Sequence, residues 1–328
     1  MIDFQSKLRL WIQCFGMKTS ASGRLTFRLA QRGDFDAVVK LSEGIYDGHD
    51  YLPFRFHKWL QRDNLDVLLA YSEEKLVGLQ ACFVVDEGRT FIRRAERTLA
   101  ELRGQGLARQ LREFARKYVR KHYPSVQRER FAAVVDMACS VDQTKLLQYD
   151  ILSYHVQRKF YGEAERSKTN SVKIEVCARE YFSEVILSDP VRALLFPDNI
   201  IIVNWCPFEP LRSNIDHMLQ ESDEFFVEKC ADDALPRSFS SGTFSPRVKF
   251  LEWHATFYTK DPVLFEAHLL HQLKRACEVI NGDLIFLSVQ DKSLTPSARK
   301  IMEENLQQKE NDWPSEETVN LYERSVSM

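Results

Sequence analysis

A short loop with two glycines constrains the fold of this chain more than any other segment. It reads Arg103-Gly104-Gln105-Gly106-Leu107-Ala108 and lies between a strand-like run and a long amphipathic helix. Glycines let phosphate oxygens approach the backbone closely, and the first N–H groups of a helix point outward with the positive end of its dipole. The sequence therefore predicts a pyrophosphate-binding turn that opens a helix.

Two nucleotide-binding motifs share features with this loop, but neither of them fits. A dinucleotide fingerprint needs a third glycine and an acidic residue about twenty positions later. Here Ala108 closes the turn, and residues 118–128 hold no Asp or Glu. A Walker loop needs Gly-Lys-Ser or Gly-Lys-Thr, and the chain holds no such string. Both nucleotide interpretations are therefore disfavoured.

The segment around the loop is strongly basic. Residues 89–130 hold thirteen Arg or Lys residues against four Glu, whereas the whole chain has a formal net charge of −2. Coenzyme A is a polyanion, so a cationic surface beside helix N–H groups would suit it. The same residues would also fit a solvated helix face after an ordinary tight turn. Because the charge is confined to one segment, we predict no nucleic-acid partner.

The segments around the loop alternate between strand-like and helical patterns. Runs rich in β-branched and aromatic residues predict strands, and apolar residues at helical spacing predict a helix that ends before Pro124. The expected elements are strands at 76–86 and 90–99, a helix from 107 to about 122, a strand at 130–137, a helical or mixed stretch at 145–160 and a strand at 171–178. This order fits a mixed α/β sheet.

The second half of the chain predicts a smaller α/β lobe. We expect strands at 200–205, 250–258 and 284–289, a helix at 261–280, and an exposed loop at 238–243. The expected organisation is an N-terminal extension at 1–23, a ligand-binding domain at 24–180, a lobe at 181–310 and a polar, frayed tail at 311–328.

The loop, with its Arg-x-x-Gly-x-Ala spacing, preceding strand and following helix, resembles the acyl-CoA loop of the GNAT acetyltransferases. A second region sharpens this resemblance toward the histidine N-acetyltransferase group. Its residues are Ile45-Tyr46, Gly48, Asp50-Tyr51-Leu52-Pro53, Arg55, His57, Trp59-Leu60, Val77-Gly78-Leu79-Gln80, Asp86, Gly88 and Thr90, with weaker similarity at Ala267-His268-Leu269-Leu270-His271-Gln272-Leu273.

The resemblance implies an α/β (α+β) fold of the GNAT type, with a mixed, mostly antiparallel sheet flanked by helices. It implies transfer of acetyl from acetyl-CoA to the α-amino group of a small amine, free L-histidine, by direct attack on the thioester. A backbone N–H near Leu99 and Ala100 would stabilise the oxyanion. The residues expected to bind acetyl-CoA are Leu99, Ala100, Arg103, Gly104, Gln105, Gly106, Leu107 and Ala108.

A connection between two expected helices, near residues 44–53, concentrates polar and aromatic side chains. A carboxylate can pair with a substrate ammonium, and Arg can hold a substrate carboxylate through two parallel hydrogen bonds. These residue types together suit an amino acid. The expected acceptor-binding residues are Tyr46, Asp50, Tyr51 and Arg55.

The resemblance also implies the catalytic groups, but the carboxylate of this chain lies two residues away from the position that the family uses. The group carries a glutamate in the register of Arg94 and a proline in that of Ala100, so this chain departs from the pattern at both positions. Glu96 would act as the base, directly or through water. Tyr149 or Tyr154 would protonate the leaving thiolate, with packing of both rings as the alternative.

Several other classes of protein are disfavoured. The seven cysteines show no C-x-x-C pair, which predicts reduced thiols and a cytoplasmic location. No apolar run reaches about 18 residues, so we expect no membrane partner. His268 and His271 have no recognisable third ligand, so we expect no metal. The oligomeric state stays open.

Two other functions also stay open at this point. In the first, the chain is a sister enzyme that acetylates another amino acid, a polyamine or a protein N-terminus. Alternatively, it would be a catalytically inactive CoA-binding module, which is motivated by the departures at Arg94 and Ala100.

Overall fold

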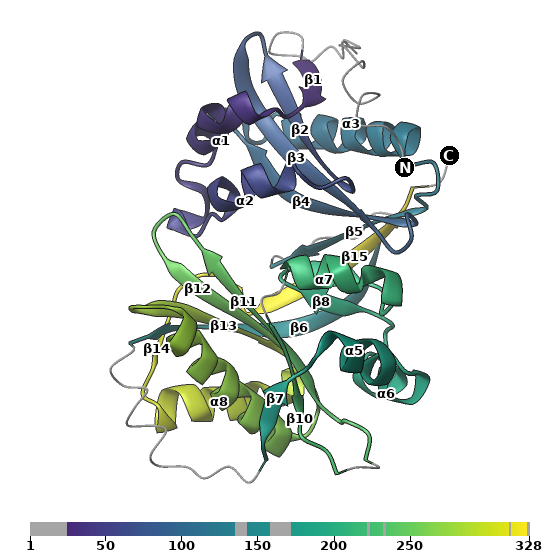
Figure 1. The fold of residues 1–328 in the computed structure, drawn as a ribbon. Coiled ribbons are helices and arrows are strands. Elements are labelled where there is room, and N and C mark those ends of the chain that lie inside the picture. Colours follow the sequence, from purple (N-terminus) through teal and green to yellow (C-terminus); the bar gives the residue numbers. More distant parts are fainter. Residues whose placement is uncertain are drawn as a thin grey trace. The chain divides into compact units, whose positions relative to one another are not determined.

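The computed structural model describes residues 25–134, 143–157, 172–221, 224–231, 234–314 and 316–326. The chain divides into two compact units (Figure 1), one with Met1–Ile45, Leu52–Val84 and Arg93–Val126, the other with Tyr46–Tyr51, Val85–Ile92 and Gln127–Met328. This division differs from the boundary expected at residue 180, and the second unit takes the larger share of the chain. The extension expected at 1–23 lies outside the described residues.

The first unit is a small sheet with helices on both of its faces. Its strands follow the order β1-β2-β3-β4, with antiparallel pairing of β1 with β2 and of β2 with β3. Its elements are β1 (Leu25–Leu29), η2 (Arg32–Asp34), α1 (Phe35–Leu41), α2 (Leu52–Trp59), β2 (Leu65–Ser72), β3 (Lys75–Val85), β4 (Thr90–Thr98), η4 (Ala100–Leu102) and α3 (Leu107–His122).

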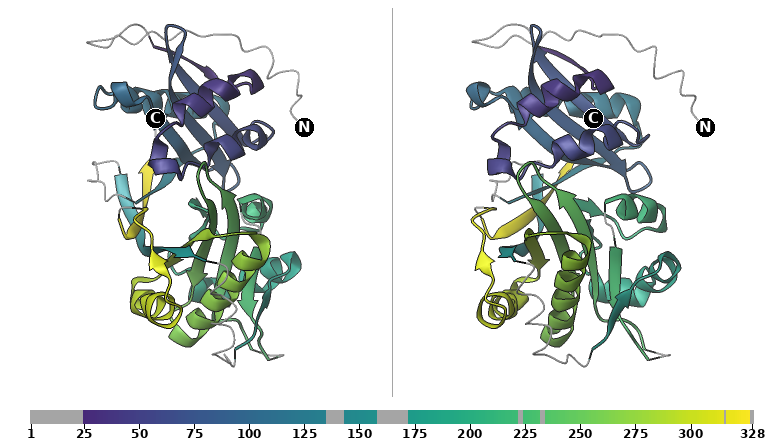
Figure 2. Two further views of the ribbon diagram at one scale, coloured as in Figure 1. Left: turned by 90° about the vertical axis from the view of Figure 1, so that its left-hand side faces the viewer. Right: turned by 60° about the vertical axis from the view of Figure 1, so that its left-hand side comes forward.

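Helix α3 packs on one face of this sheet through the predicted apolar stripe. Leu107 and Leu111 of α3 form a core with Leu25, Ala70 and Val77 from the strands. Helices α1 and α2 lie on the other face (Figure 2). The sequence prediction of strand, turn, strand, loop and helix is confirmed here, because each element carries its own local periodicity.

The second unit contains a longer mixed sheet in the order β5-β15-β6-β13-β12-β11-β10-β7. Within it β12 and β13 run parallel, and the first residues of β4 pair in parallel with β5. Its elements are η3 (Ile45–Gly48, which begins in the first unit), β5 (Arg128–Ala133), β6 (Gln143–Val156), β7 (Ile174–Val176), α5 (Arg179–Tyr181), η5 (Phe182–Ile186), α6 (Asp189–Leu195), β8 (Ile201–Val203), β9 (Cys206–Phe208), η6 (Arg212–Asn214), α7 (Ile215–Glu221), β10 (Glu224–Glu228), β11 (Phe239–Pro246), β12 (Leu251–Tyr258), α8 (Pro262–Val279), β13 (Leu284–Gln290), η7 (Lys292–Leu294), α9 (Thr295–Arg299), η8 (Lys300–Asn305), β14 (Lys309–Glu310) and β15 (Thr318–Ser325).

Strand β12 is buried on both faces. Trp253 and Phe257 pack with Leu269 and Leu273 of α8, which lies along this face of the sheet (Figures 1 and 2). Since side chains alternate along a strand, Glu252, His254 and Thr256 point to the opposite face.

Three sequence predictions were wrong in the second unit. The stretch at 145–160, read as helical or mixed, is strand β6 as far as Val156. Residues 151–154 are buried in succession, so the strand lacks the alternation that would have indicated it. The tail expected to fray contains β15, which pairs with both β5 and β6. The loop expected at 238–243 is mostly the buried strand β11.

Ser238, which precedes β11, and Ser240 of β11 contact a buried histidine of α8. Ser238 donates its hydroxyl proton to Glu228 and lies 2.9 Å from Nε2 of His268, while Ser240 lies 2.8 Å from Nδ1. Ser240 also accepts from Gln272 at 2.9 Å. These bonds fix a neutral His268 with the proton on Nε2, since Ser238 has no second proton to give. His268 is fully buried, and both of its ring nitrogens have partners.

His268 should make stability depend on pH. Burial lowers its pKa to about 3, below the value of about 6.5 for an unfolded chain. The unfolded state therefore binds more protons between these pH values, and the stabilisation present above pH 6.5 is lost as the pH falls. Between pH 7 and pH 5, urea unfolding of the wild type should lose about 2 kcal/mol more than unfolding of His268→Asn. Equal losses would contradict the assignment of a buried neutral imidazole.

Truncation of the core of β15 should destabilise the second unit strongly. Leu321 is fully buried between strands, so Leu321→Ala should lower the free energy of unfolding by about 3 kcal/mol. Glu316→Ala, an exposed position just before the strand, should change it by less than about 0.5 kcal/mol. Chemical denaturation checks both values, and a loss below about 1 kcal/mol for Leu321→Ala would mean that β15 is not part of the folded sheet.

Candidate active site

The glycine loop has the backbone geometry that the sequence predicts. Gly104 has φ +77° and Gly106 has φ +82°, both in the left-handed region that glycine favours. Gly106 is the N-cap residue of α3 and carries no side chain to cap the helix. A Cβ placed at Gly104 would meet no atom of the described residues within 4 Å. The space beside Gly104 is therefore open, which leaves room for a bound phosphate.

Two arginines give this loop its positive charge. Arg103 and Arg109 are exposed, and neither forms an ion pair within the described chain. The side chain of Arg109 reaches within 3.9 Å of the Cβ position at Gly106. Arg112, one turn further along the helix, is instead paired with Glu96. Arg103 and Arg109 therefore leave positive charge available for an anion at the loop.

The two residues expected to supply the oxyanion donor differ in their backbone bonds. The N–H of Leu99 donates to the carbonyl of Val77 at 2.9 Å, as part of the sheet. The side chain of Leu99 packs against the core beneath α3. Ala100 follows, at the exposed start of η4. Of the two, Ala100 is the candidate donor.

Glu96 lies between two guanidinium groups in the first unit. Its Oε1 accepts from Arg112 at 2.9 Å and its Oε2 from Arg93 at 3.2 Å. Arg94 instead stacks over the ring of Trp59 at 5.1 Å. Because both carboxylate oxygens of Glu96 are engaged, it would need to exchange a partner to accept a proton from an amine. Its role as the base stays a prediction.

The two tyrosines expected near the leaving group point to opposite faces of β6. Tyr154 lies in the core under α8 and donates to Glu303 at 2.9 Å. Tyr149 packs on the other face, edge-on to Tyr258. Burial raises the pKa of both phenols, which keeps them protonated. A single active site cannot use both tyrosines as the proton donor, because their side chains lie on opposite faces of the strand. Which of them protonates the thiolate stays a prediction.

The predicted acceptor residues are divided between the two units. Arg55 lies on α2 of the first unit, and Tyr46, Asp50 and Tyr51 belong to the second. Asp50 is fully buried, and its carbonyl accepts from the N–H of Val248 at 3.1 Å. The chain at 48–50 therefore runs beside residues 247–249 in the manner of a short strand pair.

Residues 48–50 lie so close to residues 247–249 that position 48 requires glycine. A Cβ there would lie 2.5 Å from the Cδ of Lys249, and the residue has φ +106°. Tyr46, which is exposed, also has positive φ and faces Trp313 with ring centroids 6.0 Å apart. Tyr51 lies under the guanidinium of Arg247, 5.1 Å from it. The segment is thus held in an unusual conformation by its neighbours.

A buried ionic group behind this segment was missed by the sequence predictions. Arg247 is hydrogen-bonded to the fully buried Glu252. The ring of His49 stacks between Phe250, at 4.2 Å, and Trp313, at 4.5 Å. Burial is the largest influence and would raise the pKa of Glu252, but the nearby Arg247, His49 and His254 together lower that pKa. Since His49 and Glu252 are two hundred residues apart, no local spacing could have indicated the group.

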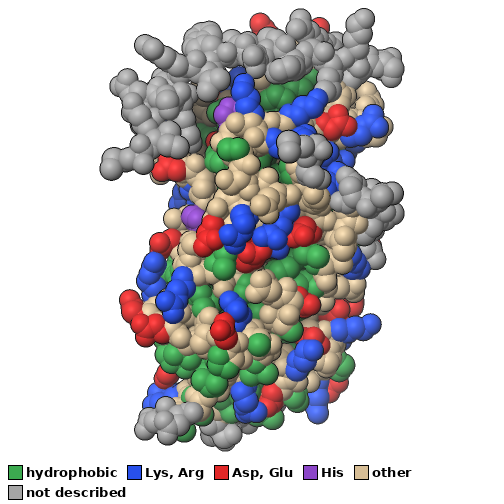
Figure 3. Space-filling view, turned by 90° about the vertical axis from the view of Figure 1, so that its right-hand side faces the viewer, with side chains coloured by type: hydrophobic (Ala, Val, Ile, Leu, Met, Phe, Trp, Pro, Cys, Tyr) green, Lys and Arg blue, Asp and Glu red, His purple; other side chains and the backbone are tan. Residues whose placement is uncertain are grey.

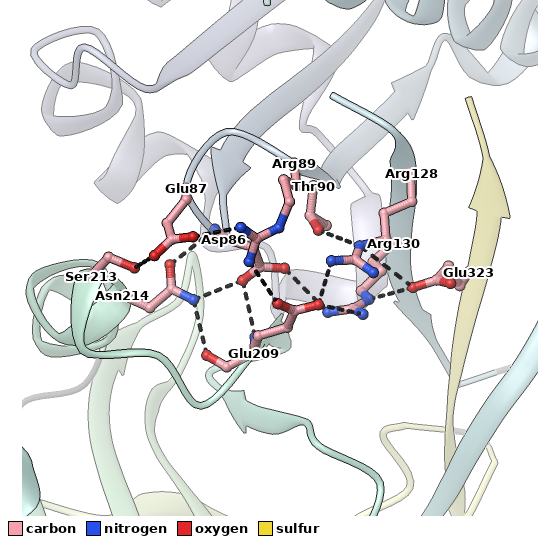
Figure 4. Close-up of polar contacts among 10 residues, drawn as sticks. All are labelled: Asp86, Glu87, Arg89, Thr90, Arg128, Arg130, Glu209, Ser213, Asn214 and Glu323. Carbon is pink, nitrogen blue, oxygen red and sulfur yellow. Dashed lines mark hydrogen bonds and ion pairs between the residues drawn. The ribbon is translucent and has the colours of Figure 1, made fainter. Parts of the chain in front are cut away.

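The turn between β3 and β4 is fixed by a second ionic network (Figure 4). Asp86 accepts from Asn214 at 2.7 Å, from the N–H of Glu209 at 3.0 Å and from Arg130 at 3.2 Å. Arg130 also donates to Glu323 of β15 at 2.8 Å. These contacts join four separate stretches of the second unit, so the predicted turn has a structural role.

The charge pattern on the surface is mixed. Figure 3 shows Lys and Arg side chains beside Asp and Glu side chains on the face that it draws. None of the helices in the described ranges is long and apolar enough to cross a membrane. Within the same ranges, no three His, Cys, Asp or Glu side chains gather as metal ligands would.

Comparisons with known proteins agree with the observed fold. The family model "Histidine N-acetyltransferase, C-terminal" matches residues 170–291. Histidine N-acetyltransferase from Scomber australasicus is 26% identical over 281 residues, which are 80% of this chain and 82% of that protein. The enzyme of that name from Oreochromis niloticus is 28% identical over 284 residues, with the same two shares.

A solved structure shares the architecture. A tandem GNAT protein from the clavulanic acid biosynthesis pathway aligns with a TM-score of 0.56 and 10% identity, over 93% of this chain and 99% of that one. The chain is an N-acetyltransferase with the GNAT fold. The predicted resemblance to the histidine N-acetyltransferases is confirmed.

Removal of the charge of Asp86 should lower the free energy of unfolding far more than removal of the charge of Glu87. Asp86→Asn keeps the shape and tolerates φ +55°, but it breaks a buried pair with Arg130 and should destabilise by about 3 kcal/mol. Glu87→Gln is the matched control, because this half-exposed carboxylate pairs with Arg89 at the surface and should matter by less than about 1 kcal/mol. Guanidinium unfolding measures both, and similar losses would show that the network does not anchor the turn.

Proposed function

We propose that this chain transfers acetyl from acetyl-CoA to the α-amino group of a small amine, with free L-histidine as the acceptor. The observation that carries the proposal is the loop at 103–108, where two left-handed glycines open α3 beside two exposed arginines. The acceptor is suggested by the relatives named histidine N-acetyltransferase.

The loop residues fit the cosubstrate. The N–H groups at the start of α3 would bind the pyrophosphate of acetyl-CoA, and Arg103 and Arg109 would neutralise it. The open space at Gly104 supports this use, since no described side chain fills it.

The proposed transfer is direct and needs one deprotonated amine. A free α-amino group has a pKa of about 8, so modest help from Glu96 or water suffices near neutral pH. The N–H of Ala100 would stabilise the oxyanion, a contact whose loss typically costs about 3 kcal/mol in the barrier. A buried thiol that burial keeps protonated, such as Cys177, offers no nucleophile for an acyl-enzyme.

Mass spectrometry of the products tests the acceptor. The purified chain is incubated with acetyl-CoA and pooled amino acids, polyamines and a short peptide, and release of free CoA is followed in parallel. Acetylated histidine is the expected product. A different acetylated amine would identify a sister activity. Tight binding of acetyl-CoA without product would favour an inactive CoA-binding module, for which the engaged oxygens of Glu96 are the supporting observation.

The loop itself is tested by two variants of the same shape. Asn and Asp both tolerate the left-handed conformation of Gly104, and they differ by one negative charge. Gly104→Asp should bind acetyl-CoA about tenfold more weakly than Gly104→Asn, because the carboxylate repels the pyrophosphate. The difference should shrink at high salt. Isothermal titration measures both affinities, and equal values would contradict this placement of the cosubstrate.

A further inference from the structure

Buried polar atoms without partners gather on the face of β12 that points away from α8. Among the described residues, Nδ1 of His49, Nε of Arg247, Oε2 of Glu252 and both ring nitrogens of His254 are buried and make no hydrogen bond. Nδ1 of His49 lies 3.7 Å from Oε2 of Glu252, which is longer than a hydrogen bond. Buried polar groups are nearly always paired, so a concentration of unpaired ones indicates a missing ligand or water.

The surroundings of these atoms are apolar and aromatic. In the parallel ladder Glu252 lies beside Ile285 and His254 beside Leu287, so their side chains share one face. That face carries a core with Ile285 and Leu287, and the ring of Trp205 lies 5.4 Å from that of His254. Polar atoms in apolar surroundings recognise a ligand by hydrogen bonds, because water competes poorly for those bonds in a buried site.

A groove lies beside this group. It has a volume of about 900 Å³ and is lined by residues that include His155, Arg247, Phe250 and Ile285. Arg247 bonds to Oε1 of Glu252, and Phe250 stacks on His49, so two residues of the groove wall contact residues that carry unpaired atoms. Glu252 and His254 are buried behind this wall, so a small molecule in the groove reaches them only after side chains of the wall move.

The donors and acceptors define the chemistry of the ligand. Burial lowers the pKa of His254 to about 4, so its ring is neutral and offers one N–H and one bare nitrogen. Glu252 offers a carboxylate oxygen, but its charge is already matched by Arg247. The pocket therefore favours a neutral ring with one donor and one acceptor over an ammonium group. Nearby, the ring of His49 stacks between Phe250 and Trp313, so aromatic faces in this region pack against an imidazole of the chain itself.

We propose that Glu252 and His254 recognise the side-chain imidazole of the acceptor amino acid. One ring nitrogen donates its proton to Oε2 of Glu252, and the other accepts the N–H of His254. The inference rests on the proposed function, because it assigns the specificity for the acceptor of that transfer.

Kinetics and binding of the full chain test this assignment. His254→Leu removes both polar atoms, and it should raise the KM for L-histidine about tenfold or more while changing the KM for acetyl-CoA less than about twofold. His254→Gln keeps one donor and one acceptor and should recover part of the loss. His268→Asn is the matched control, a buried histidine of the same unit on the opposite face, and it should leave the KM for L-histidine unchanged.

A second measurement uses the wild type and needs no variant. Saturation-transfer NMR in the presence of CoA compares L-histidine with its two ring-methylated forms, each of which lacks the ring N–H. Both should bind about tenfold more weakly than L-histidine. Equal binding of all three, equal KM values for His254→Leu and wild type, or the same loss in His268→Asn would overturn the inference and leave only ordered water at these atoms.

The two proposals can fail separately. If no amine is acetylated but L-histidine binds and His254→Leu abolishes binding, the recognition site stands and the transfer reaction falls. If another amine is acetylated and L-histidine does not bind, the transfer stands and the recognition site falls.

Discussion

Burial of both faces of β12 is the constraint on which the second unit depends. A strand in this position must satisfy every polar side chain that it carries, since water reaches neither face. On the α8 side the requirement is met, because Trp253 donates to Gln272 at 2.8 Å. On the other side it is not met at His254. The same strand thus carries a paired polar side chain on one face and an unpaired one on the other. The unpaired face is therefore the candidate site for a ligand.

The loop at 103–108 and the turn at 86–89 show two ways to fix a backbone. The loop uses glycines in left-handed conformations, so its geometry is encoded where it occurs. The turn also has positive φ at Asp86 and Glu87, but it is held by a buried carboxylate that binds Asn214, Glu209 and Arg130. The first is independent of the rest of the chain, whereas the second exists only in the folded unit.

This difference explains what the sequence could predict. Helix α3, strands β3 and β4, and the glycine loop carry local patterns, and all of them were predicted within a few residues. Strand β11 was missed because its serines suggest a loop unless His268 is known to face them. Strand β15 was missed because Asn, Glu and Arg between its apolar residues suggest a solvated tail. The stack of His49 on Phe250 joins distant segments, for which a single sequence has no signal.

The position of β15 in the chain has a consequence for synthesis of the protein. Strands β5 and β6 leave the ribosome well over a hundred residues before residues 318–325, which pair with both of them. Until then the edges that β15 will cover are open templates for pairing with other chains. The first unit uses no residue beyond Val126, so it can fold while the rest is still being made. Nascent chains of this protein should therefore need protection from aggregation mainly in their second unit, and a ribosome stalled before residue 318 would leave that unit's sheet incomplete.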